Sequence, residues 1–210
     1  MFLWDRHVKE LATELFLSNA VVSGHIRKLE EVGIVGSRMK RMDGGTYKVC
    51  FVKLEFLQIK LSPDAPAYLH KDQRLYEIEI SLEIGSEAPR VNENWPSDIR
   101  FYLNEKLLGL WRSPGDFGKT RGRLTPEWWH SDVNQYGLLK VLRTKETGTY
   151  IDGQRISDIG LCDIETNAMN WTFRIAAEDT GRGRGGLTLY GKGFGNYNQD
   201  IIVRSFYIYR

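Results

Sequence analysis

LSNAVVSGHIRKLEEVGIV, residues 17–35, decides how the first part of this 210-residue chain folds. Ser18 is a favourable N-cap, because its hydroxyl accepts a hydrogen bond from a free amide of the first helical turn. Apolar side chains then recur at the spacing of one helical face, at Val22, Ile26 and Leu29. Gly33 follows them, and glycine often ends a helix because it tolerates a positive φ. These residues predict a helix from Asn19 to Gly33.

A first helix is predicted just before it, over RHVKELATELF, residues 6–16. Its apolar residues also follow helical spacing: Val8, Leu11, Ala12 and Leu15. After the second helix the period changes to that of strands, over residues 34–42 and 46–52. Asp43-Gly44-Gly45 between them is typical of a β-turn, since glycine adopts a positive φ without strain. The first part is therefore predicted to be a helix-turn-helix followed by a β-hairpin.

Positive charge is concentrated in this first part, although the whole chain has a net charge of only +2. Residues 1–60 hold 10 Lys and Arg against 7 Asp and Glu, whereas residues 61–210 hold 19 against 20. Six of those basic residues lie between Arg27 and Lys48, together with three acidic ones. Such a cluster is expected of a protein that binds the phosphate backbone of nucleic acid, although an ordinary solvated face has the same composition.

The rest of the chain is predicted to be β-rich. Residues 62–73, SPDAPAYLHKDQ, have the prolines and polar side chains of a linker. Beyond them, strand-like segments alternate with turn signals: 75–84, 98–111, 171–178, 186–194 and 200–209. Several short strands without intervening helices indicate an antiparallel β-sandwich or jelly roll. The predicted fold class is thus α+β, with one domain over residues 1–61 and a second over residues 74–210.

Residues 8–35 resemble the winged helix-turn-helix of ArsR- and MarR-type transcriptional regulators, chiefly in the Leu-Ser, Val-Ser and Leu-Glu-Glu elements of residues 17–35. The resemblance implies that the second helix enters the major groove of DNA and that the hairpin, the wing, touches the backbone. The DNA-binding residues that it implies are Asn19, Ala20, Val21, Ser23, Arg27, Lys28, Arg38, Lys40 and Arg41. Gly24 departs from the family, which has a longer basic or polar residue there.

The start of the chain also departs from that family. Only residues 1–6 precede the first predicted helix, where the family has another helix that often dimerises. The first domain is therefore expected to be truncated at its start, and the formation of a homodimer is left open.

Blocks of the second part resemble the C-terminal β-rich region of predicted ArsR-type regulators. These blocks are residues 86–118, 121–129, 135–140, 150–159 and 186–201. Residues 98–109 are also similar to a galactose-binding-like jelly roll. The resemblance implies a β-rich fold beside a DNA-binding domain, and it implies no particular ligand.

Loops of the second part combine tryptophans with charged side chains, which is what a small polar or carbohydrate ligand needs. An aromatic face stacks on a sugar ring, while carboxylates and guanidinium groups bind its hydroxyls. The candidate ligand-binding residues are Trp95, Asp98, Asp116, Arg121, Arg123, Trp128 and Trp129. The alternative is that the tryptophans fill the core and that Arg–Asp pairs tie the loops down.

Motifs for common catalytic and cofactor chemistry are missing from the sequence. There is no GxSxG or GxxxxGK[ST], and the histidines lack metal-ligand spacing, so no catalytic residue, metal or cofactor is expected. The GxGxxG of residues 181–186 precedes a strand rather than a helix, which predicts a hairpin loop. Neither a membrane-spanning run nor a secretory signal is visible, and Cys50 and Cys162 lie far apart. A reduced, cytoplasmic protein without membrane contact is expected.

The sequence therefore favours a transcriptional regulator rather than an enzyme, with double-stranded DNA as its partner. Its β-sandwich is expected to sense a ligand or to mediate assembly. The alternative is a carbohydrate-binding module that retains a vestigial helix-turn-helix. A third hypothesis is a glycan-active enzyme with a carboxylate pair such as Asp98 and Asp116.

Overall fold

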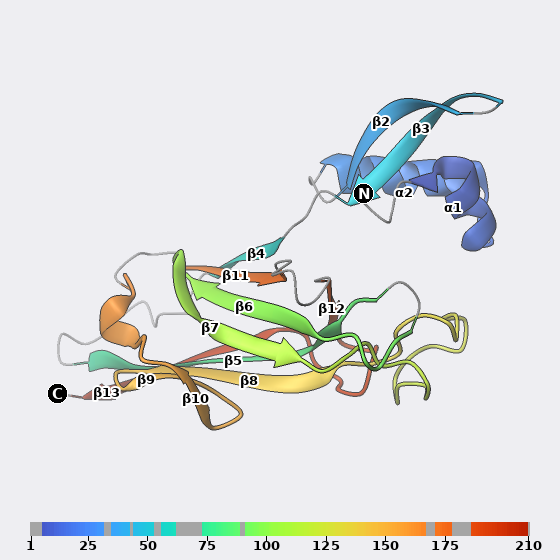
Figure 1. Ribbon diagram of the computed structural model, residues 1–210. Coiled ribbons are helices and arrows are strands. Elements are labelled where there is room, and N and C mark those ends of the chain that lie inside the picture. The colour runs from blue at the N-terminus through green and yellow to red at the C-terminus, as the bar shows by residue number, and fades with distance from the viewer. Residues whose placement is uncertain are drawn as a thin grey trace. The chain divides into compact units, whose positions relative to one another are not determined.

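The computed structural model divides the chain into two compact units, Met1–Glu55 and Phe56–Arg210 (Figure 1). The structure describes residues 6–31, 35–42, 44–52, 56–61, 73–88, 91–166, 171–177 and 186–209. Antiparallel strands dominate these residues, which contain two α-helices, both in the first unit, and one short 3₁₀ helix in the second.

The first unit contains two helices joined by a short turn and a three-stranded antiparallel sheet. Its elements are β1 (Arg6–His7), α1 (Val8–Glu14), α2 (Asn19–Glu31), β2 (Val35–Met42) and β3 (Gly45–Val52), with the sheet order β1-β3-β2. Ser18 caps α2 as predicted, because its Oγ accepts a hydrogen bond from the Val21 amide at 3.3 Å. The predicted helix end at Gly33 lies outside the described residues.

A small apolar core holds the two helices against the sheet. It consists of Ala12, Val22, Ile26 and Cys50, with Val8, Leu11 and Val35 packed around it. The predicted apolar faces of both helices are thus largely confirmed. Leu15 and Leu29 differ. Leu15 lies after the end of α1, and both side chains are exposed and lie outside this core. The predicted hairpin is confirmed as well: Met42 pairs with Gly45, and Gly44 turns the chain with a φ of +98°.

The second unit contains two antiparallel sheets. Its elements are β4 (Phe56–Leu61), β5 (Gln73–Ser86), β6 (Ser97–Leu103), β7 (Lys106–Ser113), β8 (Leu138–Lys145), β9 (Gly148–Ile151), β10 (Gln154–Ser157), η1 (Leu161–Asp163), β11 (Trp171–Ala177), β12 (Leu187–Tyr190) and β13 (Ile202–Tyr209). One sheet has the order β4-β11-β6-β7. The other has the order β10-β9-β8-β5-β12, and β13 also pairs with β5. Strands β12 and β13 therefore share one edge of the long strand β5, one after the other.

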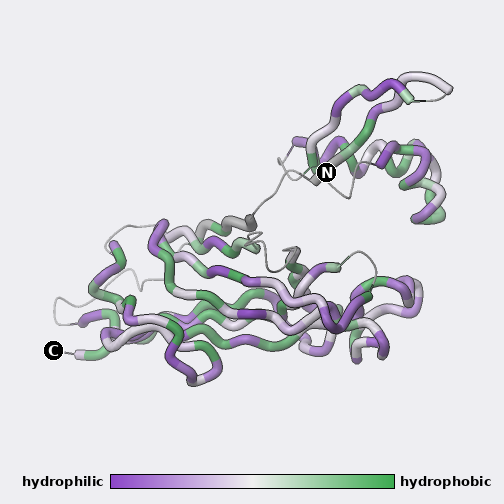
Figure 2. Tube along the Cα trace, viewed as in Figure 1, coloured by the Kyte–Doolittle hydropathy of each residue, from purple (hydrophilic) through white to green (hydrophobic). Residues whose placement is uncertain are grey.

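The core of the second unit lies between its two sheets (Figure 1). Alternate residues of β5, from Ile78 to Ile84, contribute one side of it, and Phe101 and Phe173 stack with ring centroids 6.3 Å apart on the other side. The hydrophobic and hydrophilic residues along these strands follow the same alternation in Figure 2. Two antiparallel sheets around one core are compatible with the predicted β-sandwich.

The boundary between the units differs from the sequence prediction of a first domain over residues 1–61. Strand β4 belongs to the second unit, because it pairs along its whole length with β11, from Trp171 opposite Leu61 to Ala176 opposite Phe56. The predicted linker over residues 62–73 lies outside the described residues, except for Gln73, which opens β5. The residues next to β4 in the sequence do not reveal this pairing, because the partner strand β11 comes over 100 residues later.

The outer face of β5 is also buried, although it carries glutamates. Glu77, Glu79, Ser81 and Glu83 are all buried. Arg143 on β8 reaches both Glu77 and Glu79, with its Nη2 2.7 Å from Glu79 Oε2. Arg204 on β13 donates a hydrogen bond to Glu79 at 2.6 Å from the other side. Cationic side chains of the two neighbouring strands thus cover Glu77 and Glu79, whereas Glu83 accepts hydrogen bonds from backbone amides.

Candidate nucleic-acid interface

The first turns of α2 present small and apolar side chains to solvent. Asn19, Ala20 and Val21 are all exposed, as the resemblance requires of a DNA-reading surface. Val22 and Ile26 lie in the core, so the buried and exposed faces of α2 are well separated. Ser23 is only half-buried, and its hydroxyl donates to the Asn19 carbonyl at 2.7 Å. The proton of Ser23 is therefore used within the helix.

Two cations follow on the exposed side of α2, one to two turns further along. Arg27 and Lys28 are exposed, and neither has an ion-pair partner within the described residues. Lys28 thus offers its positive charge to an anion from outside the unit, while Arg27 also attracts the nearby Glu30 carboxylate. The positive end of the helix dipole, at Asn19, adds to the same field.

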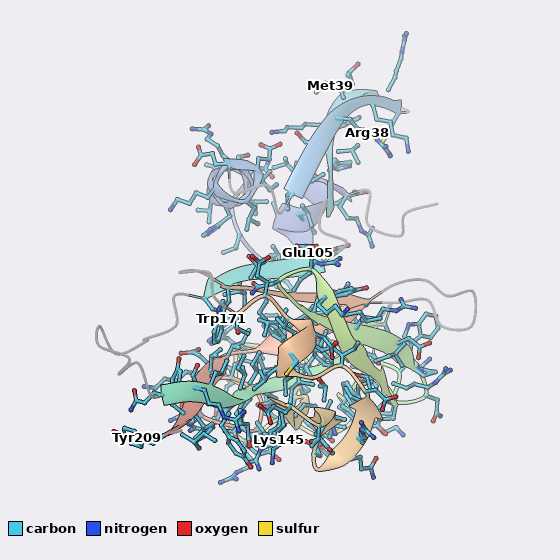
Figure 3. All side chains as sticks on the ribbon, turned by 90° about the vertical axis from the view of Figure 1, so that its left-hand side faces the viewer. Arg38, Met39, Glu105, Lys145, Trp171 and Tyr209 are labelled. Carbon is cyan, nitrogen blue, oxygen red and sulfur yellow. The ribbon has the colours of Figure 1, made fainter. Side chains whose placement is uncertain are left out.

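The β2–β3 hairpin carries the other predicted basic residues. Arg38, Lys40 and Arg41 are exposed on β2, and Figure 3 shows Arg38 with its neighbour Met39 on this strand. Because side chains alternate along a strand, Arg38 and Lys40 lie on one face of the hairpin and Arg41 on the other. The hairpin therefore offers cations on both of its faces.

Glu30 connects α2 to the hairpin, a contact that the sequence did not predict. Its carboxylate accepts hydrogen bonds from the Ser37 hydroxyl on β2 and from Lys48 Nζ on β3, the latter at 2.8 Å. The hydrogen bonds from Lys48 and Ser37 hold the pKa of Glu30 below its ordinary value. One charged side chain thus fixes how the hairpin stands against the helix.

His7 connects α1 to the same hairpin. Its Nδ1 accepts a hydrogen bond from the Glu10 amide at 3.2 Å, and Glu10 in turn accepts from the His7 amide at 3.0 Å. The imidazole ring also stacks on Tyr47 of β3, with centroids 4.9 Å apart. Histidine is not among the usual N-cap residues, so this cap had no recognisable sequence signal.

The candidate ligand-binding residues of the second unit do not converge on one surface. Arg121, Arg123, Trp128 and Trp129 share the loop between β7 and β8. Trp128 is 76% exposed, whereas the Trp129 indole is half-buried and donates to the Asn134 carbonyl at 2.8 Å. The two rings meet edge to face, with centroids 5.7 Å apart.

The remaining candidates of this set have structural contacts or are buried. The Arg121 guanidinium donates to the backbone carbonyls of Pro126 and Glu127, so it shapes its own loop. Asp98 on β6 lies 3.4 Å from Arg112 on β7. Trp95 is half-buried. Asp116 is only 1% exposed, so a ligand at the surface does not reach it. Arg121 thus holds its own loop through backbone carbonyls, and Asp98 pairs with an arginine of the adjacent strand.

A buried polar cluster surrounds Asp116. Its Oδ2 accepts a hydrogen bond from the Ala88 amide at 3.2 Å, while its Oδ1 has no hydrogen-bond partner in the described part of the chain. Burial raises the pKa of Asp116 to about 7, and the neighbouring Glu87 carboxylate adds to this effect. Burial likewise raises the pKa of Glu87, and that of Tyr190 above its ordinary value.

Comparisons with known proteins add no assignment. No family model, curated protein or solved structure matches the chain. The resemblance to winged-helix regulators stays a prediction. Among the described residues, no helix is long and apolar enough to cross a membrane. The same residues contain no group of three or more His, Cys, Asp or Glu that could hold a metal ion.

Proposed function

We propose that this chain is a DNA-binding transcriptional regulator, whose first unit is a winged helix-turn-helix and whose second unit senses a ligand or mediates assembly. The observation that carries the proposal is the exposed N-terminal half of α2 beside a hairpin with exposed cations. A helix of this kind fits the major groove, while cations on a hairpin neutralise the flanking phosphates.

The available charge supports this proposal. Arg27 and Lys28 on α2 and Arg41 on β2 have no ion-pair partner within the described residues. Each phosphate contact that such a residue makes releases a counterion from the DNA, which favours binding at low salt. The three residues therefore form the electrostatic part of the proposed interface.

The rigid connection between helix and hairpin supports it as well. Glu30 bonds to both strands of the hairpin, and His7 stacks on Tyr47. Because the helix and hairpin are held together, one duplex can meet both without a loss of conformational entropy on binding. For the second unit, we propose a jelly-roll fold, and for the whole protein a cytoplasmic location. A ligand or partner that binds the second unit changes the affinity of the first unit for DNA, because the two binding sites are coupled.

The experiment is a fluorescence anisotropy titration of a mixed-sequence 30-base-pair duplex with the full chain at several salt concentrations. The electrostatic part of binding is independent of sequence, so no operator is needed. We expect the logarithm of affinity to fall linearly with the logarithm of salt concentration. Replacing Arg27, Lys28 or Arg41 by Ala should each reduce the slope by about 1.

The matched control is Lys106→Ala, which removes an exposed cation of the second unit. This variant should bind like the unchanged chain. Unchanged slopes in all three variants of the first unit, or no binding of duplex at low salt, would contradict the proposal.

A carbohydrate-binding module is the second candidate function, and Trp128 is the observation that favours it. The ring is largely exposed while Trp129, edge-on to it, holds the loop in place. An exposed, fixed aromatic ring is a platform on which a sugar stacks. Two results together would favour this candidate over the regulator. The chain would not bind duplex DNA, and its tryptophan fluorescence would change on addition of a glycan only when Trp128 is present.

A further inference from the structure

We infer that the first two turns of α2 recognise A·T base pairs, by contact of Ala20 and Val21 with thymine methyl groups and by hydrogen bonds of Asn19 with adenine. This inference rests on the proposed function and adds to it the class of DNA sequence that is recognised. It follows from which side chains α2 exposes and which it does not.

The exposed surface at the start of α2 carries apolar side chains, although contact with solvent favours polar ones. Val21 is 44% exposed although the small core of this unit lies on the opposite face of the helix. Ala20 and Gly24 are four residues apart, so they lie on one exposed side next to Val21. A Cβ at Gly24 would meet no atom within 4 Å, which shows that this side is open. The side chains at these positions are short, so the edges of the bases can approach the helix closely.

The positive charge near this apolar surface indicates which kind of molecule binds it. Arg27 and Lys28 follow on the same helix, and the hairpin adds exposed cations on β2. An apolar patch that is flanked by cations complements a groove whose floor carries methyl groups and whose rims carry phosphates. A duplex with thymines in its major groove has both features, side by side along the groove.

The chemistry of the exposed residues then favours A·T over G·C pairs. Thymine alone presents a methyl group in the major groove, and small apolar side chains contact it. The side chain of Asn19 has no hydrogen-bond partner among the described residues, and Asn pairs with N6 and N7 of adenine. No Arg or Lys lies between positions 19 and 24 to bond guanine O6 and N7.

The test begins with selection of duplexes from a randomised library by the full chain. We expect the selected sites to share a run of A·T pairs. Each thymine of the best site is then replaced by deoxyuridine, which lacks only the methyl group. At one or two positions the affinity should fall about fourfold, because the complex loses the burial of one methyl group.

Two matched variants assign that loss to Val21. In Val21→Ser the penalty for deoxyuridine should disappear, because the side chain no longer has methyl groups. In Val21→Thr, which keeps one methyl group, the penalty should remain. Asn19→Ala should remove the preference for adenine at one position. Val21 and Asn19 are both exposed, so none of the three variants is expected to change the fold.

Two outcomes overturn this inference separately from the proposed function. If deoxyuridine binds as well as thymine at every position, or if G·C sites that depend on Arg27 are selected, the inference is wrong. The regulator would still stand on its salt-dependent binding. If no duplex binds at all, both the inference and the proposed function are wrong.

Discussion

Phe16, in the turn between α1 and α2, has a φ of +54° and a side chain that is 87% exposed. A side chain with a Cβ is strained in this left-handed conformation, by roughly 1–2 kcal/mol. Phe16→Gly relieves the strain, although glycine costs roughly 0.5–1 kcal/mol through the entropy of the unfolded chain. We expect a net stabilisation of about 0.5 kcal/mol, measured as an increased midpoint of urea unfolding of the first unit.

Phe16→Ala is the control for this prediction. It removes the exposed ring but keeps the Cβ, so the strain remains and no stabilisation is expected. Equal stabilisation by Ala and Gly would show that the ring, rather than the backbone conformation, is unfavourable.

Asp116 makes the stability of the second unit depend on pH. Its pKa in the folded chain is about 7, raised by burial above the ordinary value of 3.8. Between these two values the folded state holds a proton that the unfolded state has lost. Stability therefore falls as the pH rises from about 4 to about 7, and it levels off above that. The upper limit of this loss is about 4 kcal/mol for a shift of three units.

The variant Asp116→Asn should flatten this dependence, because an amide does not titrate in this range. We expect the melting temperature of the unchanged chain to be lower at pH 8 than at pH 5.5, and the difference to shrink in the variant. A smaller slope of the same sign should remain, since burial also raises the pKa of Glu87. Asp132→Asn, at an exposed position of the same loop, serves as the control. An identical pH dependence in Asp116→Asn and the unchanged chain would refute this role.

At the scale of elements, local signals were sufficient for α2 and for the hairpin. Ser18 caps α2 through a contact three residues away, and Gly44 turns the hairpin between adjacent strands. Such features depend on a few neighbouring residues, so the sequence reveals them. The His7 cap and the Glu30 contact to the hairpin escaped prediction. The His7 cap uses a residue type that is unusual at this position of a helix, and the Glu30 contact joins residues up to 18 positions apart.

Strand β5 shows the limit of local signals. The alternation of glutamate and isoleucine predicted a strand, and the strand is present. The alternation alone does not reveal that Arg143 and Arg204 cover Glu79 on the outer face of this strand. Burial raises the pKa of Glu79, and the hydrogen bonds from the two arginines outweigh this effect and leave it lowered. These partners lie far along the chain, on β8 and β13, where only the sheet order brings them to β5.

At the scale of the whole molecule, the division into units makes a prediction about truncation. A fragment of residues 56–210 keeps β4 on β11, whereas a fragment of residues 62–210 removes β4 and leaves the outer edge of β11 unpaired. We expect the shorter fragment to melt at least about 5 °C below the longer one, since a lost strand costs more than 1–2 kcal/mol. Calorimetry of the two fragments measures the difference. Equal melting temperatures would place β4 outside the cooperative unit.

The sequence by itself determined the two helices, the cap, the hairpin turn and the β-rich character of the second part, because each depends on residues that are close along the chain. The tertiary structure alone decided that Phe56–Leu61 belongs to the second unit, that Asp116 is buried and that the glutamates of β5 are covered. The physical reason is that strand pairing and burial depend on contacts between distant segments, and the spacing of neighbouring residues does not encode those contacts.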